Sequence, residues 1–135
     1  MSPEQKQIVR NTWQEVAPQG DMAAQLFYNR LFEIDPSSRS LFQDVDLPKQ
    51  RTKLLQALSD AVQGLDAPDA LVPVLEDLGR RHADYGVTDD HYDSVGAALL
   101  WALEQGLGPD WTPEAKDAWA EAYALISGVM RHAGH

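Results

Sequence analysis

The chain has 135 residues, 44% of them hydrophobic and 24% charged, which is typical of one globular domain large enough to bury a core. Its formal net charge of -10 argues against binding to nucleic acid or to an anionic membrane, because both need basic surface. The chain has no cysteine, which excludes disulfides, thiolate catalysis and cysteine-ligated zinc or iron–sulfur sites.

Apolar residues recur at helical spacing from the N-terminus onward, and no stretch alternates apolar and polar residues as a strand does. Ser2-Pro3-Glu4-Gln5 predicts a helix start, with a serine N-cap, a proline at the first helical position and a glutamine that completes a capping box. Pro18 is expected to end this helix. Asp21 is expected to cap a second helix, which Asp35-Pro36 breaks. The residues that share the inner faces are Val9, Trp13 and Val16, then Phe27, Leu31 and Ile34.

A short turn from Pro36 to Phe42 and a polar loop over residues 43–49 are expected next. A third helix is then predicted from about Lys49 to near Gly64. Leu54, Leu58 and Ala61 mark its apolar face.

Three more helices are predicted in the second half. Asp69 is expected to cap the fourth, which ends at Gly86 in a left-handed conformation. The fifth begins at Thr88 or Asp89 and ends in the glycine- and proline-containing residues 106–109. Thr112-Pro113-Glu114 opens the last helix by the same logic as the first. Their inner faces carry Leu71, Leu75, Leu78 and His82, then Tyr92, Val95, Leu99 and Leu103, then Trp119, Tyr123, Ile126 and Met130.

We therefore expect an all-α fold of six main helices and one or two short ones. No internal repeat or linker divides the sequence, so residues 1–135 are expected to form a single domain. The N-terminus has no apolar signal core, and the longest apolar run, residues 95–103 with Gly96 inside it, is too short to span a membrane. A cytoplasmic protein is expected.

The positions of the histidines single out one candidate ligand for iron or another metal. Residues 1–81 contain none, and His82 closes an apolar helical stripe, so its ring is expected to point inward. The alternative is a half-buried histidine that interacts with the helix dipole. His91 lies at a helix start and is expected to be exposed, whereas His132 and His135 lie in terminal residues that commonly fray.

The first half of the chain supplies no imidazole but three other candidates, Tyr28, Phe42 and Gln50. Each has an ordinary alternative: a tyrosine at the edge of the core, a core phenylalanine and a solvent-exposed glutamine. Their order, with Leu54 one turn after Gln50, is typical of a haem pocket. One side of such a pocket holds the iron, and the other offers neutral hydrogen-bonding groups to a bound gas.

Seven segments follow one another in an order and spacing that are specific when taken together. They are Trp13, residues 26–32 (LFYNRLF), 35–42, 50–54 (QRTKL), 78–87 (LGRRHADYGV), 91–96 and 117–123. In these segments the chain resembles the bacterial single-domain haemoglobins, a globin lineage that includes the globin domains of flavohaemoglobins.

The resemblance implies a three-over-three globin fold around one b-type haem (iron protoporphyrin IX). Its iron ligand falls on His82, its distal tyrosine and glutamine on Tyr28 and Gln50, and its proximal tyrosine on Tyr92. Phe42 would pack on the haem and Leu54 would lie over the iron. Lys53 and Arg81 are candidates for the haem propionates, with solvated cations as the alternative. The remaining wall residues are Leu58, Leu78, Val87, Val95 and Ile126.

The chemistry that the resemblance implies is reversible binding of dioxygen, nitric oxide or carbon monoxide, with Tyr28 and Gln50 stabilising the ligand. The second ring nitrogen of His82 is expected to bond a backbone carbonyl in its own helix. Two departures from flavohaemoglobins stand out. The glutamate that bonds the proximal histidine there falls at about Gly134, and we expect no flavin- or NAD-binding domain as part of this protein.

Three functions remain open at this stage. The first is oxygen binding, for storage, delivery or scavenging. The alternative is a nitric oxide dioxygenase that takes electrons from a separate flavin- and NAD(P)H-dependent reductase. The third is a globin-like interaction or sensor module without haem, which His82 and the apolar pocket disfavour.

Overall fold

The computed structural model describes residues 1–134, and these form six α-helices, three short 3₁₀ segments and no strand. The six main helices expected from the sequence are therefore confirmed, with one more short segment than expected. The α-helices are α1 (Pro3–Val16), α2 (Gly20–Ile34), α3 (Leu47–Gly64), α4 (Pro68–Asp84), α5 (Asp89–Leu107) and α6 (Pro113–Gly134). The 3₁₀ segments are η1 (Ala17–Gln19), η2 (Pro36–Phe42) and η3 (Gly108–Asp110).

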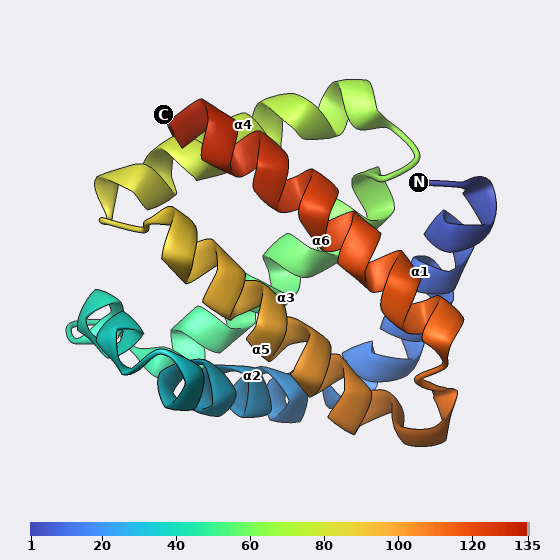
Figure 1. Ribbon diagram of the computed structural model, residues 1–135, viewed down its shortest axis with the longest axis horizontal. Helices are drawn as coiled ribbons and strands as arrows, with labels where there is room; N and C mark the ends of the chain where they lie inside the picture. Colours follow the sequence, from blue (N-terminus) through green and yellow to red (C-terminus); the bar gives the residue numbers. More distant parts are fainter. Residues whose placement is uncertain (135) are drawn as a thin grey trace.

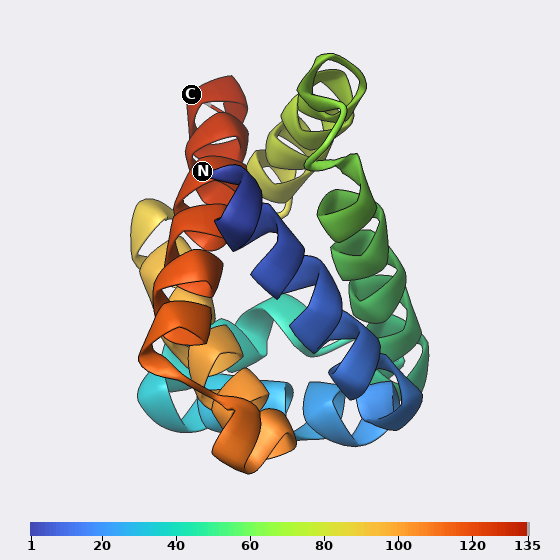
Figure 2. The same cartoon turned by 90° about the vertical axis from the view of Figure 1, so that its right-hand side faces the viewer.

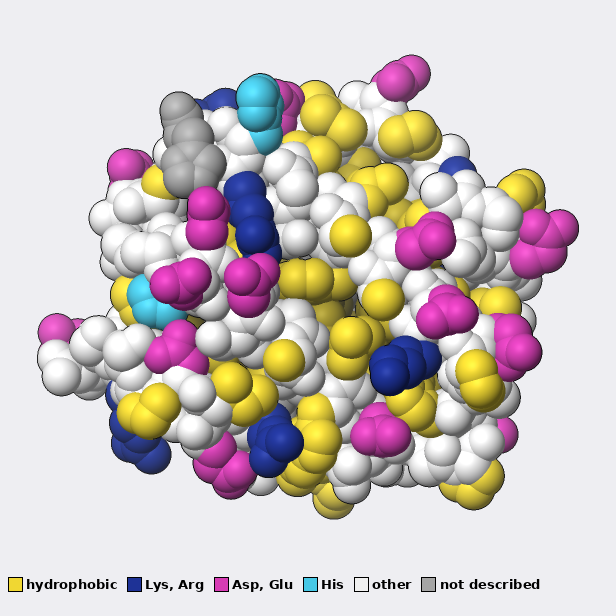
Figure 3. All heavy atoms as spheres, viewed as in Figure 1, with side chains coloured by type: hydrophobic (Ala, Val, Ile, Leu, Met, Phe, Trp, Pro, Cys, Tyr) yellow, Lys and Arg dark blue, Asp and Glu magenta, His cyan; other side chains and the backbone are white. Residues whose placement is uncertain are grey.

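The helices pack in two layers of three (Figures 1 and 2). Helices α1, α3 and α4 make one layer, and α2, α5 and α6 make the other. Helix α6 packs on both α4 and α1, and α2 packs on α5. This is the three-over-three arrangement that the resemblance implies. Acidic side chains are distributed over the face shown in Figure 3, in keeping with the net charge of -10.

Local capping signals start several helices where the sequence predicts. The Ser2 hydroxyl accepts from the Gln5 N–H at 3.1 Å, and the Gln5 side chain accepts from the Ser2 N–H at 3.0 Å. The Thr112 hydroxyl accepts a hydrogen bond from the Ala115 N–H at 3.1 Å and so starts α6. These bonds satisfy amide groups that the first turn of a helix leaves unpaired.

Three predicted boundaries are wrong. Asp21 does not cap α2, because the 3₁₀ turn η1 leads directly into the helix and the Asp21 carboxylate pairs with Arg51 at 2.8 Å. Asp69 does not cap α4, which begins one residue earlier at Pro68. The loop expected over residues 43–49 is shorter, because the Asp46 side chain caps α3.

The core lies between the layers and is anchored by two tryptophans. The rings of Trp13 and Trp119 lie 6.2 Å apart, and both are buried. The indole N–H of Trp119 donates to the Thr12 hydroxyl at 2.8 Å, and that of Trp13 donates to Ser59 at 3.0 Å. Buried indoles need such partners, so these bonds fix how α1 meets α6 and α3. Ile34, expected on an inner face, is 42% exposed at the last residue of α2.

A close approach of α4 to α6 is made possible by Gly79. A Cβ atom at this position would lie 2.2 Å from the Met130 carbonyl oxygen, so no larger residue fits without separating α4 from α6. The contact brings the end of α6 against the segment of α4 that carries His82. Within residues 1–134, no helix combines the length and the apolar character needed to cross a membrane.

Candidate functional site

His82 lies in the last turn of α4 and is half-buried. Its Nδ1 lies 2.7 Å from the Leu78 carbonyl oxygen, one turn earlier in the same helix. A carbonyl can only accept, so Nδ1 carries the proton and Nε2 keeps a free lone pair. The expected bond to a backbone carbonyl is confirmed, and it leaves the ring in the tautomer that a metal ion requires.

The backbone after His82 is fixed by the end of the helix. The Val87 N–H donates to the His82 carbonyl at 3.0 Å, and Gly86 between them has a φ of 92°. That φ lies in the left-handed region, which glycine adopts without steric cost. The predicted glycine cap is therefore confirmed. It turns the chain sharply and brings Tyr92 of α5 beside His82, with the two rings 6.4 Å apart and inclined by 25°.

On the other side of the candidate pocket, α2 and α3 bring Tyr28 and Gln50 together. Tyr28 is only 5% exposed, and the Gln50 side chain lies close enough to lower the pKa of its phenol. Burial raises the pKa of the Tyr28 phenol above its usual value, which outweighs the lowering by Gln50 and Arg51. The hydroxyl therefore stays protonated and able to donate. The Phe42 ring packs edge-on against Tyr28, with ring centroids 5.4 Å apart.

The expected wall residues share one property, which is that all are apolar and partly buried against the core. This group is Phe42, Leu54, Leu58, Leu78, Val87, Val95 and Ile126. A flat apolar cofactor needs side chains that are available to pack on it yet shielded from bulk water. Together with the free Nε2 of His82, these side chains fit a haem.

Lys53 and Arg81, expected at the rim, are both exposed. Arg81 pairs with Asp77 on its own helix at 2.7 Å, an i,i+4 pair on the surface.

The other histidines lie outside this cluster. His91 is half-buried rather than exposed as expected, because its ring folds back and Nδ1 accepts from the Thr88 N–H at 3.0 Å. It thereby completes the cap that starts α5. His132 is exposed in the last turn of α6, and His135 lies outside the described residues.

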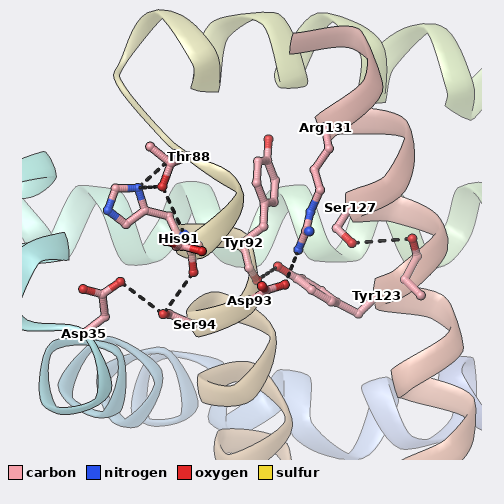
Figure 4. A network of polar contacts seen from close by, with 11 residues as sticks. Asp35, Thr88, His91, Tyr92, Asp93, Ser94, Tyr123, Ser127 and Arg131 are labelled. Carbon is pink, nitrogen blue, oxygen red and sulfur yellow. Dashed lines mark hydrogen bonds and ion pairs between the residues drawn. The ribbon is translucent and has the colours of Figure 1, made fainter. Parts of the chain in front are cut away.

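Sequence reasoning missed a group of side chains that joins α5 to α6 beside Tyr92 (Figure 4). Tyr123 and Arg131 of α6 reach the start of α5, where Tyr123 bonds the Tyr92 backbone and Arg131 pairs with Asp93. Their spacing of eight residues puts both on one face of a helix, which was the available signal. The partner of that face depends on how the two helices cross.

Comparison with known proteins agrees with this geometry. Residues 25–130 match the Globin family model. The flavohemoprotein of Bacillus subtilis (strain 168) is 31% identical over 126 residues, covering 92% of this chain and 32% of that protein. The flavohemoprotein of Rhizobium meliloti (strain 1021) is 33% identical over 129 residues, covering 93% and 32%. This chain thus spans about a third of the length of the flavohemoproteins it matches.

Neuroglobin of Danio rerio is 27% identical over 143 residues, covering 96% of this chain and 90% of that protein. A crystal structure of a hexacoordinated heme protein from an anhydrobiotic tardigrade, determined at pH 4, superposes with a TM-score of 0.90. The superposition covers 99% of this chain and 95% of the tardigrade chain at 18% sequence identity, and it supports the fold. The chain belongs to the globin family, and haem is the cofactor of that family.

Proposed function

We propose that residues 1–135 act as one globin domain that binds a b-type haem through His82 and reversibly binds dioxygen, with nitric oxide and carbon monoxide as further ligands. Haem supplies a ferrous iron that can bind a diatomic gas. His82 would hold the iron through Nε2, because Nδ1 is already committed to Leu78.

The observation that carries the proposal is the buried phenol of Tyr28 with the Gln50 side chain beside it, in a region to which α2 and α3 bring no histidine. Dioxygen in such a pocket gains partial negative charge, and a neutral phenol and a neutral amide can both donate to it. Neither side chain competes for ferrous iron as an imidazole does. The pocket therefore keeps one face open and lined with donors.

The apolar surroundings support the same function by excluding water. Behind Leu54 and Leu58 lies a cavity of about 20 Å³ that is lined only by apolar side chains, Phe27 among them. Water gains nothing from such a lining. Tyr28 itself is 5% exposed, so a hydrogen bond that it donates to a ligand is stronger than it would be in water.

The similarity to flavohemoproteins favours a second candidate, a nitric oxide dioxygenase served by a separate reductase. The pocket residues are the same for both functions. Turnover of nitric oxide to nitrate in the presence of a flavin- and NAD(P)H-dependent reductase would distinguish catalysis from oxygen binding alone.

The test of the proposed function is the oxygen dissociation rate of the wild type and of Tyr28→Phe. A hydrogen bond to a partly charged ligand is worth about 1.5–3 kcal/mol, so the variant should release oxygen about 10- to 150-fold faster. Carbon monoxide is less polar when bound, and its release should change far less. The matched control is Tyr85→Phe, since Tyr85 is 69% exposed. A Tyr28→Phe rate within about twofold of wild type would contradict the assigned role.

A further inference from the structure

The start of α5 is bonded to α6 through Tyr123, whose ring packs against α5. The Tyr123 hydroxyl donates to the Tyr92 carbonyl at 2.5 Å. Gly96 provides the space, because a Cβ atom there would lie 2.7 Å from the Tyr123 ring. The backbone that carries Tyr92 is therefore held in place from α6.

Arg131 holds the side chain of the same tyrosine. Its guanidinium carbon lies 5.1 Å from the Tyr92 ring centroid, and its Nη2 lies 2.7 Å from the Asp93 carboxylate. The Nε is buried and has no hydrogen-bond partner among the described residues. A guanidinium that stacks on an aromatic ring leaves an N–H without a hydrogen-bond partner. The Asp93 carboxylate thus binds the end of the Arg131 side chain, and the Tyr92 ring lies beside that side chain (Figure 4).

The contact chain continues from Tyr92 to His82. Tyr92 is 8% exposed, and its ring lies nearly parallel to the imidazole. The bond from Nδ1 to Leu78 fixes one edge of the imidazole but leaves the ring free to tilt about that edge. A flat neighbour on one face restricts this tilt, and the tilt sets the direction of the Nε2 lone pair.

The glutamate that the resemblance would place beside His82 is absent, because the corresponding position is Gly134. Gly134 lies against α4, where a Cβ atom would be 3.1 Å from the Gly79 carbonyl oxygen and 3.2 Å from the Ala83 Cβ. A side chain at this position would require its neighbours on α4 to shift by a few tenths of an ångström. Among the described residues, α6 brings the Arg131 cation over Tyr92 and no carboxylate side chain onto His82.

We propose that Arg131 is a positioning residue, which holds the Tyr92 ring against His82 and so fixes the direction in which Nε2 meets iron. The proposal rests on the proposed function, since it takes His82 as the iron ligand. The charge of Arg131 is paired with Asp93, and Asp89 lies at the same helix start. The effect therefore comes from the local contact of the guanidinium with the Tyr92 ring and not from the net charge of the helix start.

The experiment measures the iron–histidine stretching band of the ferrous, gas-free protein by resonance Raman, and the rate of haem loss to a scavenger protein. Arg131→Met keeps the aliphatic stem and removes the guanidinium. We expect a shifted and broader band and haem loss about two- to fivefold faster, the range for a lost cation–π contact. Arg10→Met is the matched control, because the Arg10 side chain is 26% exposed against 28% for Arg131 and pairs with Asp66, outside this cluster.

Two further variants separate positioning from charge and from general destabilisation. Arg131→Lys keeps the charge without the planar group and should resemble Arg131→Met, so a wild-type band in this variant would overturn the proposal. In a Tyr92→Leu background, Arg131→Met should cause no further shift, because Arg131 acts through Tyr92. An additional shift of equal size in that background would also overturn it.

Asp93→Asn keeps the proposal testable if Arg131→Met does not fold, because Asp93 is exposed and only anchors the outer end of Arg131. It should shift the band in the same direction by a smaller amount, and an unchanged band would count against the proposal. A wild-type protein with no iron–histidine band would contradict the proposed function itself. A normal wild-type band that Arg131→Met leaves unchanged would contradict only the role of Arg131.

Discussion

The two sides of the candidate pocket are held by different kinds of contact. On the Tyr28 side the phenol is packed among aromatic rings, with Phe27 and Phe42 at centroid distances of 4.9 Å and 5.4 Å, and has the neutral Gln50 side chain beside it. On the His82 side the imidazole depends on a backbone carbonyl, a stacked ring and an ion pair supplied from α6.

Under the proposed function, this difference separates the residues that would control the gas from those that would control the cofactor. The Tyr28 side is built from α2, η2 and α3, and its chemistry rests on protons that neutral side chains donate. The His82 side requires α4, α5 and α6 to be held in register. Changes there should affect haem retention and folding first, and ligand lifetime second.

Removal of the iron ligand should give the largest effect. His82→Ala should lose haem on gel filtration, and its thermal stability should fall, because a cofactor that binds only the folded state stabilises that state. The measurement is the ratio of haem to protein, with His132→Ala as control, since His132 is exposed. Full haem content with an unchanged spectrum in His82→Ala would mean that another residue holds the iron.

The next largest effect should come from forcing α4 and α6 apart. In Gly79→Ala the new methyl group would meet the Met130 backbone, and the free energy of unfolding should fall by about 2–4 kcal/mol. Gly128→Ala in α6 is the control. Its Cβ meets nothing within 4 Å, so it should gain about 0.5–1 kcal/mol from helix propensity. Equal stabilities of the two variants in denaturant would show that the close approach is absent.

A smaller effect is expected from the second donor on the Tyr28 side. Gln50→Leu should speed oxygen release about two- to tenfold, the range for one neutral hydrogen bond, and should leave haem retention unchanged. Gln56→Leu on the same helix is the control, because Gln56 is exposed and bonds Asp60. Because the Tyr28 and Gln50 side chains are close neighbours, the double variant with Tyr28→Phe should not be additive. Strict additivity would mean that the two side chains act separately.

The smallest effect should be that of pH on oxygen release. Burial disfavours the charged phenolate, so the pKa of Tyr28 lies above its ordinary value of 10.0 and the donor proton is retained. The wild-type dissociation rate should therefore stay constant between about pH 6 and pH 9. Stopped-flow measurements across this range test it. A rate that rises with a midpoint near neutral pH would point to a different titrating donor.

Much of this architecture could be predicted from the sequence because its signals are local. The caps at Ser2 and Thr112 and the glycine at 86 act within a few residues of themselves. The bond from His82 to Leu78 is also local, since the two residues are one turn apart. The start of α3 carried a readable signal too, in Asp46 followed by Pro48.

The remaining features depend on contacts between distant segments. Asp21 could not be separated from a cap without knowing that Arg51 would pair with it. The arrangement of Tyr123 and Arg131 around Tyr92 follows from the crossing of α5 and α6, which helical periodicity does not specify. Arg131 looks like an ordinary surface residue until its partner face is known.

The most direct test of a single histidine ligand with an open opposite face is the absorption spectrum of the ferrous protein at neutral pH without added gas. We expect a five-coordinate, high-spin iron, because His82 is placed to bind it whereas neutral Tyr28 and Gln50 are poor ligands. A six-coordinate, low-spin ferrous spectrum under the same conditions would contradict that arrangement.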